Sequence, residues 1–205
     1  MPVRKTIPDA PIQGRAIQTR KDLMAAARRI FARDGFEVAR LQDIATEAGK
    51  TRGALYAHFA NKEDLFFALI EEDIERDNEF FRTRLTPESS WEDRVAAVVD
   101  HMESLLCDRK RVLLYLEFKL YAIRHPNRQK RLADLHSAWC TRGMETSIKL
   151  VPELHVKSPR KQRAVFAVLG AVLDGLALNL YFDPGVLSRT EVRSRIEHVV
   201  RERIL

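Results

Sequence analysis

The spacing of apolar residues constrains this chain most strongly, because it repeats with the period of an α-helix. The first apolar stripe consists of Leu23, Ala26, Ala27, Ile30 and Phe31. Residues three and four apart share one face of a helix, and Gly35 can end that helix in the left-handed conformation. Later helices are expected at about 41–48, 51–59, 61–81 and 90–106. Four more follow: one that ends at 124, two at about 127–150 and 158–183, and a last one that begins at about 190. No segment alternates as a half-buried strand does, so we expect an all-α protein of about nine helices.

Composition excludes several classes of protein. The chain has 205 residues, of which 45% are hydrophobic and 31% charged, which is typical of a soluble globular protein. Its two cysteines form no disulfide framework, and the polar N-terminus lacks the apolar region of a secretory signal, so a cytoplasmic protein is expected. The most apolar stretch, Ala164 to Phe182, contains Asp174 and Asn179, which favours a buried helix over a membrane span.

Positive charge is concentrated in the first third of the chain. Residues 1–62 contain 12 Lys and Arg against 6 Asp and Glu, whereas residues 63–205 contain 23 of each. A surplus confined to one segment predicts an anionic partner for that segment, with nucleic acid the leading candidate.

Residues 41–59 have the pattern of a helix-turn-helix. A short helix stops at Gly49, and a second helix, capped by Thr51, would turn Leu55 and Phe59 inward. Arg52 and Tyr56 would then point outward, as required of a helix that enters the major groove with its N-terminus first. Spacing alone fits a surface helix hairpin equally well, and the concentrated positive charge favours DNA binding.

The segment IATEAGKTRGALYAHFANKEDL resembles the DNA-binding signature of the TetR family of bacterial transcriptional regulators, and AARRIFARDGF resembles the first helix of that family. The resemblance covers about residues 17–77. It implies a DNA surface made of Arg40, Gln42, Lys50, Thr51, Arg52, Gly53, Ala54, Tyr56, Ala57, His58 and Lys62.

The chemistry of these side chains suggests a role for each. Arg52 is the best base reader, because its guanidinium can take O6 and N7 of guanine. Gln42 could read adenine or bind a phosphate, and Ala54 and Ala57 could touch a thymine methyl group. The expected phosphate contacts are Thr51, Tyr56, His58 and Lys62, with packing beside an aromatic residue as the alternative for His58.

Two positions depart from the family pattern. Ala39-Arg40-Leu41 lacks the hydroxyl residue that usually caps the second helix, so its phosphate contact is lost or passes to Arg40. Lys50 replaces a small apolar residue of the turn and adds a charge that could reach the DNA backbone or a base.

The expected domains are a basic flexible arm at 1–16, a DNA-binding domain at 17–77 with its helix-turn-helix at 40–59, and an effector-binding and dimerisation domain at 78–205. Basic residues near the arm could follow the minor groove or the DNA backbone, although Arg4 and Lys5 fit a solvated tail equally well. These basic residues are Arg4, Lys5, Arg15, Arg20 and Lys21.

The C-terminal two-thirds resembles the effector and dimer domain of the family more loosely. Ala167, Ala171 and Gly175 recur every four residues and suit a two-fold dimer interface, with packing inside the chain as the alternative. An apolar effector pocket is expected from aromatic residues and a few polar groups, each of which fits an ordinary core position as well. These candidates are Tyr115, Phe118, Tyr121, His136, Trp139, Phe166, Asp174 and Asn179. Asp174 attracts attention because a buried carboxylate needs a partner.

We therefore expect a dimeric repressor that leaves a palindromic double-stranded operator when a small lipophilic effector binds. The alternative is a sensor or co-regulator of the same fold that acts through a protein partner. The six histidines form no metal-ligand motif, and neither a phosphate-binding loop nor a nucleophile elbow is present, so no enzyme activity, metal or cofactor is expected.

Overall fold

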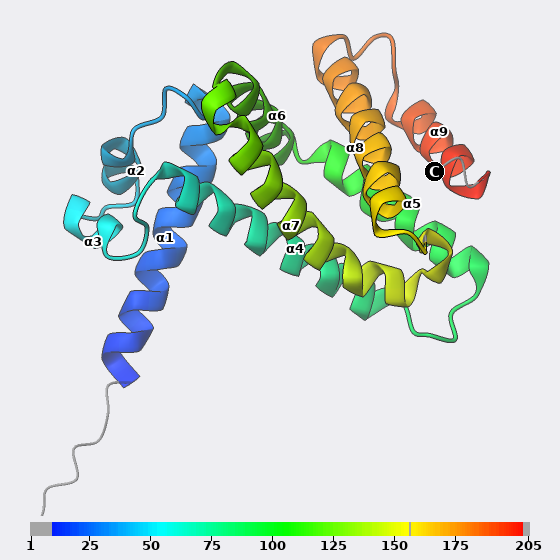
Figure 1. Ribbon diagram of the computed structural model, residues 1–205, viewed down its shortest axis with the longest axis horizontal. Coiled ribbons are helices and arrows are strands. Elements are labelled where there is room, and N and C mark those ends of the chain that lie inside the picture. Colours follow the sequence, from blue (N-terminus) through cyan, green and yellow to red (C-terminus); the bar gives the residue numbers. More distant parts are fainter. Residues whose placement is uncertain (1–9, 156, 203–205) are drawn as a thin grey trace, which may run out of the picture. The chain divides into compact units, whose positions relative to one another are not determined.

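The computed structural model describes residues 10–155 and 157–202, and all regular structure in these residues is helical (Figure 1). In these described residues nine α-helices and one 3-10 helix follow one another in chain order, which confirms the all-α prediction. They are α1 (Ala10–Asp34), α2 (Leu41–Glu47), α3 (Arg52–Tyr56), α4 (Lys62–Arg84), α5 (Trp91–Cys107), α6 (Arg109–Arg124), α7 (Pro126–Leu150), η1 (Pro152–Leu154), α8 (Pro159–Phe182) and α9 (Arg189–Arg201).

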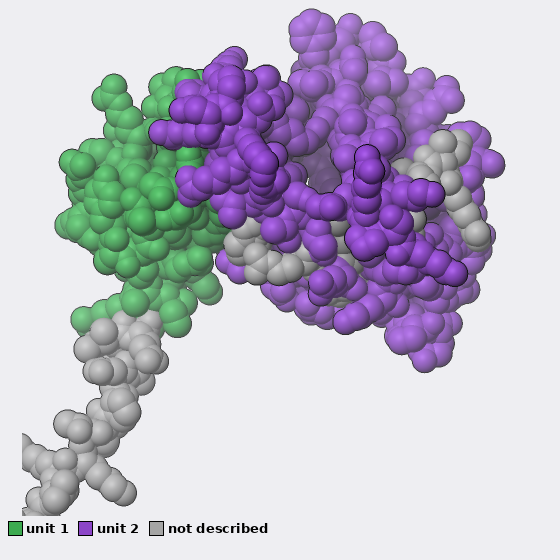
Figure 2. Space-filling model, in the orientation of Figure 1, with its two compact units in different colours: residues 1–69 green, residues 70–205 purple. Residues whose placement is uncertain are grey.

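The chain divides into two compact units, residues 1–69 and 70–205, coloured separately in Figure 2. The division falls inside the continuous helix α4. The predicted functional boundary at 77/78 stays a prediction. So does the arm: residues 1–9 lie outside the described residues, and residues 10–16 form the first part of α1.

The first unit packs α1, α2, α3 and the start of α4 around a small aromatic core. Phe36 lies in its centre, with ring centroids 5.2 Å from Phe31 and 5.4 Å from Phe66. All three phenylalanines are fully buried, as is the predicted stripe residue Leu23. Helix α1 ends where expected: Gly35 has a φ of 82°, and its amide donates to the Phe31 carbonyl at 3.1 Å.

The second unit is built on α5, which packs against α8 and α9, while α6 packs against α7 and α8. Ser90 forms a capping box with Asp93 at the start of α5, and Ser188 forms another with Glu191 at the start of α9. Arg201 of α9 joins the two helices through a paired contact with Glu92, 2.8 Å at the shorter distance.

The prediction of a buried helix at 164–182 is wrong for the isolated chain. Helix α8 is long and apolar enough to cross a membrane, yet only 11% of its most apolar window is buried. A single helix of this length and apolarity is weak evidence for a membrane span, because a core helix of a soluble protein can be equally long and apolar. The sequence shows that α8 is apolar. It does not show whether the surface that covers this helix belongs to the same chain or to another.

Candidate nucleic-acid interface and apolar cavity

Helices α2 and α3 form a helix-turn-helix whose turn depends on Gly49. Its φ of 64° lies in the left-handed region, which favours glycine, and the next amide, that of Lys50, donates to the Ala45 carbonyl at 2.8 Å. Ala45 is fully buried, so its small side chain lets α2 lie close to the neighbouring helices. The turn therefore sets the direction in which α3 begins.

The two helices begin in different ways. The Thr51 hydroxyl accepts a hydrogen bond from the Ala54 amide at 3.1 Å and so caps α3, as predicted from the sequence. The cap residue of α2 is Arg40, whose side chain makes no capping hydrogen bond. Because Arg40 is exposed, its guanidinium stays available to an anion outside the protein.

Arg52 and Tyr56 form an exposed pair one helical turn apart on α3. The Arg52 guanidinium lies 5.4 Å from the centre of the Tyr56 ring and donates to its hydroxyl at 3.5 Å. Tyr56 keeps 44% of its surface exposed. The pair thus orients the guanidinium at the start of α3 without neutralising its charge.

Two of the residues predicted to contact DNA already bind other groups within the protein. Lys50 forms an ion pair with Asp22 of α1 at 2.8 Å, and hydrogen bonds from Lys50 and then Gln18 hold the pKa of Asp22 below its usual range. The Lys62 ammonium donates to the carbonyls of Glu37 and Ala39 at 2.8 and 3.1 Å. Lys62 therefore fastens the loop before α2 to the start of α4, and its phosphate contact stays a prediction.

The remaining predicted DNA residues line the same part of the first unit. His58 is half-buried, with its ring centroid 6.3 Å from that of Phe59, and Ala54 is also half-buried. The exposed members are Gln42, Thr51, Gly53 and Ala57.

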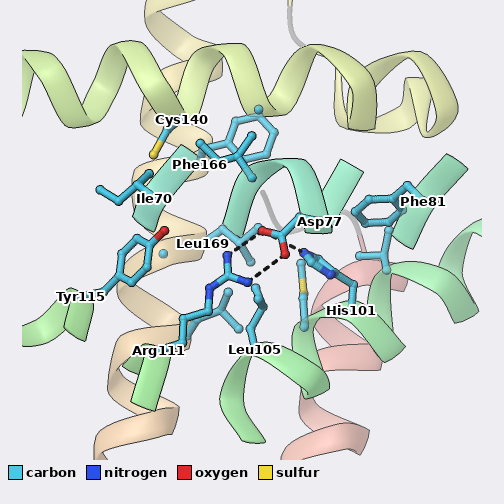
Figure 3. Close-up of a pocket in the computed structure, with 16 residues that line it drawn as sticks. Ile70, Asp77, Phe81, His101, Leu105, Arg111, Tyr115, Cys140, Phe166 and Leu169 are labelled. Carbon is cyan, nitrogen blue, oxygen red and sulfur yellow. Dashed lines mark hydrogen bonds and ion pairs between the residues drawn. The ribbon is translucent and has the colours of Figure 1, made fainter. Parts of the chain in front are cut away.

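An apolar cavity of about 270 Å³ lies inside the second unit (Figure 3). Side chains from α4, α5, α6, α7 and α8 enclose it, and most of them are aliphatic or aromatic. The lining residues are Ile70, Ile74, Asp77, Phe81, Val98, His101, Met102, Leu105, Arg111, Tyr115, Cys140, Gly143, Phe166, Leu169, Gly170 and Leu173. An apolar wall with a few convergent polar groups is typical of cavities that bind small molecules.

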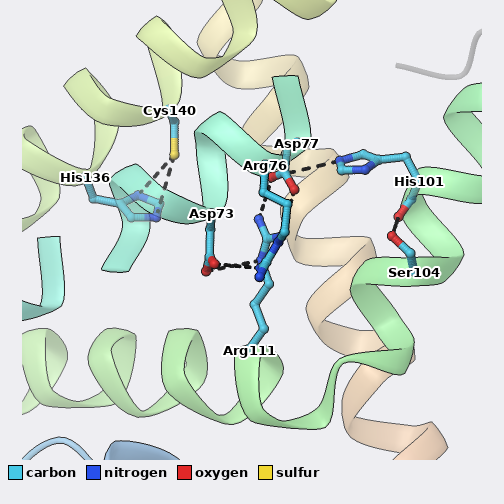
Figure 4. Close-up of polar contacts among 8 residues, drawn as sticks. All are labelled: Asp73, Arg76, Asp77, His101, Ser104, Arg111, His136 and Cys140. Atoms are coloured by element: carbon cyan, nitrogen blue, oxygen red, sulfur yellow. Dashed lines mark hydrogen bonds and ion pairs between the residues drawn. The ribbon is translucent and has the colours of Figure 1, made fainter. Parts of the chain in front are cut away.

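Polar groups gather at one side of this cavity (Figures 3 and 4). Arg111 of α6 donates to both carboxylate oxygens of Asp77 at 2.8 and 2.6 Å, and its Nε lies 3.5 Å from an oxygen of Asp73. Burial alone would lower the pKa of Arg111, but hydrogen bonds to Asp77 raise it, so the group stays charged. His101 Nε2 lies 4.0 Å from Asp77, and burial lowers the pKa of His101.

A second polar pair, His136 and Cys140, lies one turn apart on α7, and Cys140 lines the cavity. The His136 ring lies 3.7 and 3.8 Å from Cys140 Sγ through its two nitrogens, and 6.3 Å from the Tyr115 ring between centroids. Burial lowers the pKa of His136 and raises those of Cys140 and Tyr115. Near pH 7 these three groups are therefore neutral.

Among the residues predicted to form an effector pocket, Tyr115 and Phe166 line the cavity. Phe118 is buried in the core, and Tyr121 accepts a hydrogen bond from Arg128 at 2.7 Å. Asn179 is exposed and donates to the Gly175 carbonyl of its own helix. The side chain of Trp139 lies outside the described residues.

Asp174 has the partner that its position on an apolar helix required. Its carboxylate forms a close ion pair with Lys119 of α6. Both side chains are about one-third exposed, so this pair joins α6 to α8 near the surface.

The sequence analysis missed Asp77, His101 and Arg111, which supply the polar side of the cavity. The available signal was Asp73, which lies on the apolar face of α4 and is fully buried, with Asp77 one turn later on the same face. Two carboxylates in that position require a cation, and only the tertiary fold shows that Arg111 provides it.

The small-residue stripe of α8 lies at the surface. Ala167 and Ala171 are exposed and Gly175 is half-buried. Large apolar side chains on the same helix are exposed as well, with Val168 at 56%, Leu178 at 53% and Phe182 at 88%. Exposed apolar surface of this extent is typical of an interface.

Comparisons with known proteins agree with the helix-turn-helix geometry. Residues 23–69 match the family described as "Bacterial regulatory proteins, tetR family". The transcriptional repressor AcnR of Corynebacterium glutamicum is 43% identical over 58 residues, which cover 28% of this chain and 31% of AcnR. The transcriptional regulator SrpR of Pseudomonas putida is 37% identical over 92 residues, 43% of this chain and 42% of SrpR. The chain thus spans about a third of the length of AcnR.

Solved structures extend the likeness to the whole fold. The fatty acid degradation regulator FadR of Bacillus halodurans superimposes with a TM-score of 0.59 at 21% identity, covering 96% of each chain. GusR of Salmonella enterica gives a TM-score of 0.62 at 21% identity, covering 94% of this chain and 98% of GusR. The match over residues 23–69 thus shows an N-terminal domain of the TetR type, and the likeness of the whole chain to these solved structures is one of fold.

Proposed function

We propose that the protein is a transcriptional repressor that binds a palindromic DNA operator as a homodimer and leaves it when a small lipophilic effector binds. The observation that carries this proposal is the start of α3, where a capped helix presents the exposed Arg52 guanidinium beside Tyr56. A helix placed in this way can enter the major groove, and a guanidinium at its start can take the two acceptors of guanine.

The other DNA residues would divide between positioning and reading. Arg40, Gln42, Thr51 and Tyr56 are exposed and have the chemistry of phosphate contacts, with Gln42 able to reach a base instead. Lys50 would have to leave Asp22 before it could bind DNA, so it contributes less than its charge suggests.

The exposed face of α8 supports a homodimer. A second copy related by two-fold symmetry could cover Val168, Ala171 and Leu178 with the same residues of its own chain. A dimer also suits the proposed DNA target, since two recognition helices must meet major-groove faces about 34–36 Å apart. Val168→Asp should therefore yield monomers in sedimentation and weaken operator binding, whereas Ala96→Asp, on an exposed site of α5, should leave the dimer intact.

The cavity supports an effector that acts through α4. This one helix carries Lys62, which holds the loop before α2, and Asp77, which lines the cavity fifteen residues later in the printed sequence. A ligand that favours one position of α4 would change the separation of the two recognition helices in a dimer. Such a ligand must bind the two states unequally, because equal affinity would shift nothing.

The proposal is tested by selecting bound duplexes from a random DNA pool across a series of salt concentrations. We expect an enriched palindrome whose affinity falls steeply as salt is added. Salt-sensitive binding without an enriched motif would contradict sequence-specific repression and favour a co-regulator that acts through a protein partner.

A further inference from the structure

A second apolar cavity, of about 260 Å³, lies between α5, α8 and α9. Four apolar residues line this second cavity and do not line the first cavity, which is that of Figure 3: Val172, Leu176, Ile196 and Val199. Of the described residues in its wall, only Arg195 is charged. Arg195 is exposed, so its aliphatic stem can cover the wall while its guanidinium stays in solvent. The second cavity therefore favours an apolar occupant over a polar one.

The two cavities share part of their walls. Met102 of α5 and Leu169 and Leu173 of α8 line both. Met102 is 5% exposed and Leu169 is 8% exposed, so this boundary lies inside the second unit rather than at its surface. Methionine is unbranched and adapts its shape to irregular space, and leucine can change rotamer without losing a hydrogen bond. Rotation of these three side chains can therefore open a passage between the two cavities.

The combined space has a polar end and an apolar end. Asp77, His101 and Arg111 lie at one side of the first cavity, whereas aliphatic side chains surround the second (Figure 3). Helix α8 lines the two cavities from Phe166 to Leu176, which is about 15 Å at the helical rise of 1.5 Å per residue. An extended alkyl chain advances about 1.2 Å per carbon, so a chain of about twelve carbons matches this span.

Two glycines of the first cavity differ in the space around them. A Cβ built on Gly170 would meet no atom within 4 Å, and Gly170 lies three positions before Leu173 on the same face of α8. A Cβ on Gly143 of α7 would instead lie 2.8 Å from the Ile74 side chain. Gly143 therefore permits a close approach of α7 and α4, while Gly170 leaves open space next to the shared wall.

We propose that the two cavities together bind one molecule with an unbranched alkyl chain of about twelve carbons, whose polar head lies in the first cavity and whose tail passes Met102 and Leu173 into the second. This inference rests on the proposed effector role of the first cavity and assigns its ligand class. A straight chain passes between movable side chains, whereas a ring or a branched body of the same volume stays in the first cavity.

The first test measures binding of 1-hexanol, 1-octanol, 1-decanol and 1-dodecanol to the full-length protein in the absence of DNA. Dissociation constants are obtained by equilibrium dialysis of the radiolabelled alcohols, each below its solubility limit. We expect each added methylene to tighten binding about two- to fourfold as far as 1-dodecanol, because each one buries more apolar surface. An affinity that stops rising at 1-octanol would overturn the inference, since the chain would then end in the first cavity.

Val199→Phe locates the tail. Val199 is half-buried on α9, and a phenyl ring there fills space in the second cavity and leaves the wall of the first unchanged. We expect 1-dodecanol to bind at least tenfold more weakly to this variant, while 1-hexanol binds as before. Val186→Phe makes the same change at a valine that is 66% exposed and should leave both affinities unchanged. Undiminished binding of 1-dodecanol to Val199→Phe would overturn the inference.

Two further variants make the assignment independent of the folding of Val199→Phe. Val172→Phe enters the second cavity from α8, at a side chain that is 39% exposed, and should cause the same selective loss of 1-dodecanol binding. Gly170→Leu narrows the first cavity, so 1-hexanol and 1-dodecanol should both bind at least tenfold more weakly. Full affinity of Gly170→Leu for 1-dodecanol would place the ligand outside the first cavity and overturn the inference.

A side chain from a second copy of this chain is the competing occupant of the second cavity, because Val172 is partly exposed on α8. Sedimentation of Val199→Phe distinguishes the two occupants. We expect the sedimentation coefficient of the unmodified protein together with weaker binding of 1-dodecanol. A lower sedimentation coefficient with undiminished binding of 1-dodecanol would assign the second cavity to the second copy and overturn the inference.

The same probes separate this inference from the proposed function. If 1-dodecanol binds as expected but leaves affinity for the selected DNA unchanged, the ligand class stands and the effector role fails. If none of the four alcohols binds, the ligand class is overturned, whereas repression is still judged by the DNA selection.

Discussion

Arg52 and Arg111 are the same side chain in two regions with opposite demands. Arg52 lies at the surface of the first unit, where its only described neighbour of note is the Tyr56 ring and hydroxyl. Arg111 lies in the second unit with its side chain 12% exposed and two carboxylates around it. An arginine can bind an external partner where its N–H groups make few bonds within the protein. It has a structural role where carboxylates of the same chain accept those hydrogen bonds.

The largest expected effect follows from breaking the buried pair. Arg111→Ala removes the bidentate pair with Asp77 and the contact with Asp73, and should lower the free energy of unfolding by roughly 3–5 kcal/mol. Chemical denaturation with urea measures this change. Lys110→Ala, the exposed neighbour on the same helix, is the control and should change it little. An Arg111→Ala protein as stable as the control would contradict the structural role of the pair.

Arg52→Ala should behave in the opposite way. Its unfolding free energy should be almost unchanged, while binding to the selected operator weakens by about 1–3 kcal/mol and one base position loses its preference. Repeating the DNA selection with the variant checks this outcome. Arg33→Ala, at an exposed arginine of α1 that pairs with Asp34, should retain the full operator motif. An unaltered motif in Arg52→Ala would remove this residue from base reading.

Asp22 is intermediate between these two cases, because it forms an ion pair with a lysine near the surface rather than with a buried arginine. Asp22→Asn should free Lys50 and strengthen binding to random DNA severalfold, with the slope of log affinity against log salt steeper by about one ion. A double-mutant cycle separates the release of Lys50 from the general effect of removing one negative charge. If Asp22→Asn has the same effect in a Lys50→Ala background, the gain does not pass through Lys50.

The smallest expected effect concerns the two helix starts. Arg40→Ser would give α2 the hydroxyl cap that α3 has in Thr51, and should raise unfolding free energy by about 0.5–1 kcal/mol. Thr51→Ala should lower it by about 1 kcal/mol. Thermal unfolding monitors both changes. A less stable Arg40→Ser protein would show that the arginine side chain supports α2 in some other way.

The helix-turn-helix was predictable because its determinants are local. Gly35 and Gly49 punctuate the helices, Thr51 caps α3, and the apolar period of α1 places Leu23 and Phe31 in the core. Each of these features depends on residues within a few positions along the chain. Helix α3 nevertheless ends at Tyr56, earlier than the expected residue 59.

The cavity was less predictable because its polar side depends on distant residues. Arg111 meets Asp77 across 34 positions of the chain, and no local pattern reports that distance. Aromatic composition pointed to Tyr115 and Phe166, which line the cavity, and equally to Tyr121, which binds Arg128 instead. Helix α8 illustrates the same limit, since its apolar sequence did not show which of its faces the chain itself covers.

Gly170 has a consequence for how proteins of this kind diversify. Every glycine codon becomes an alanine or a valine codon through one base change, and at this position the added atoms enter open cavity space. At Gly143 the same base change drives a Cβ into Ile74. A lineage could therefore narrow the range of molecules that the cavity admits by one nucleotide substitution in α8, while keeping its helix packing.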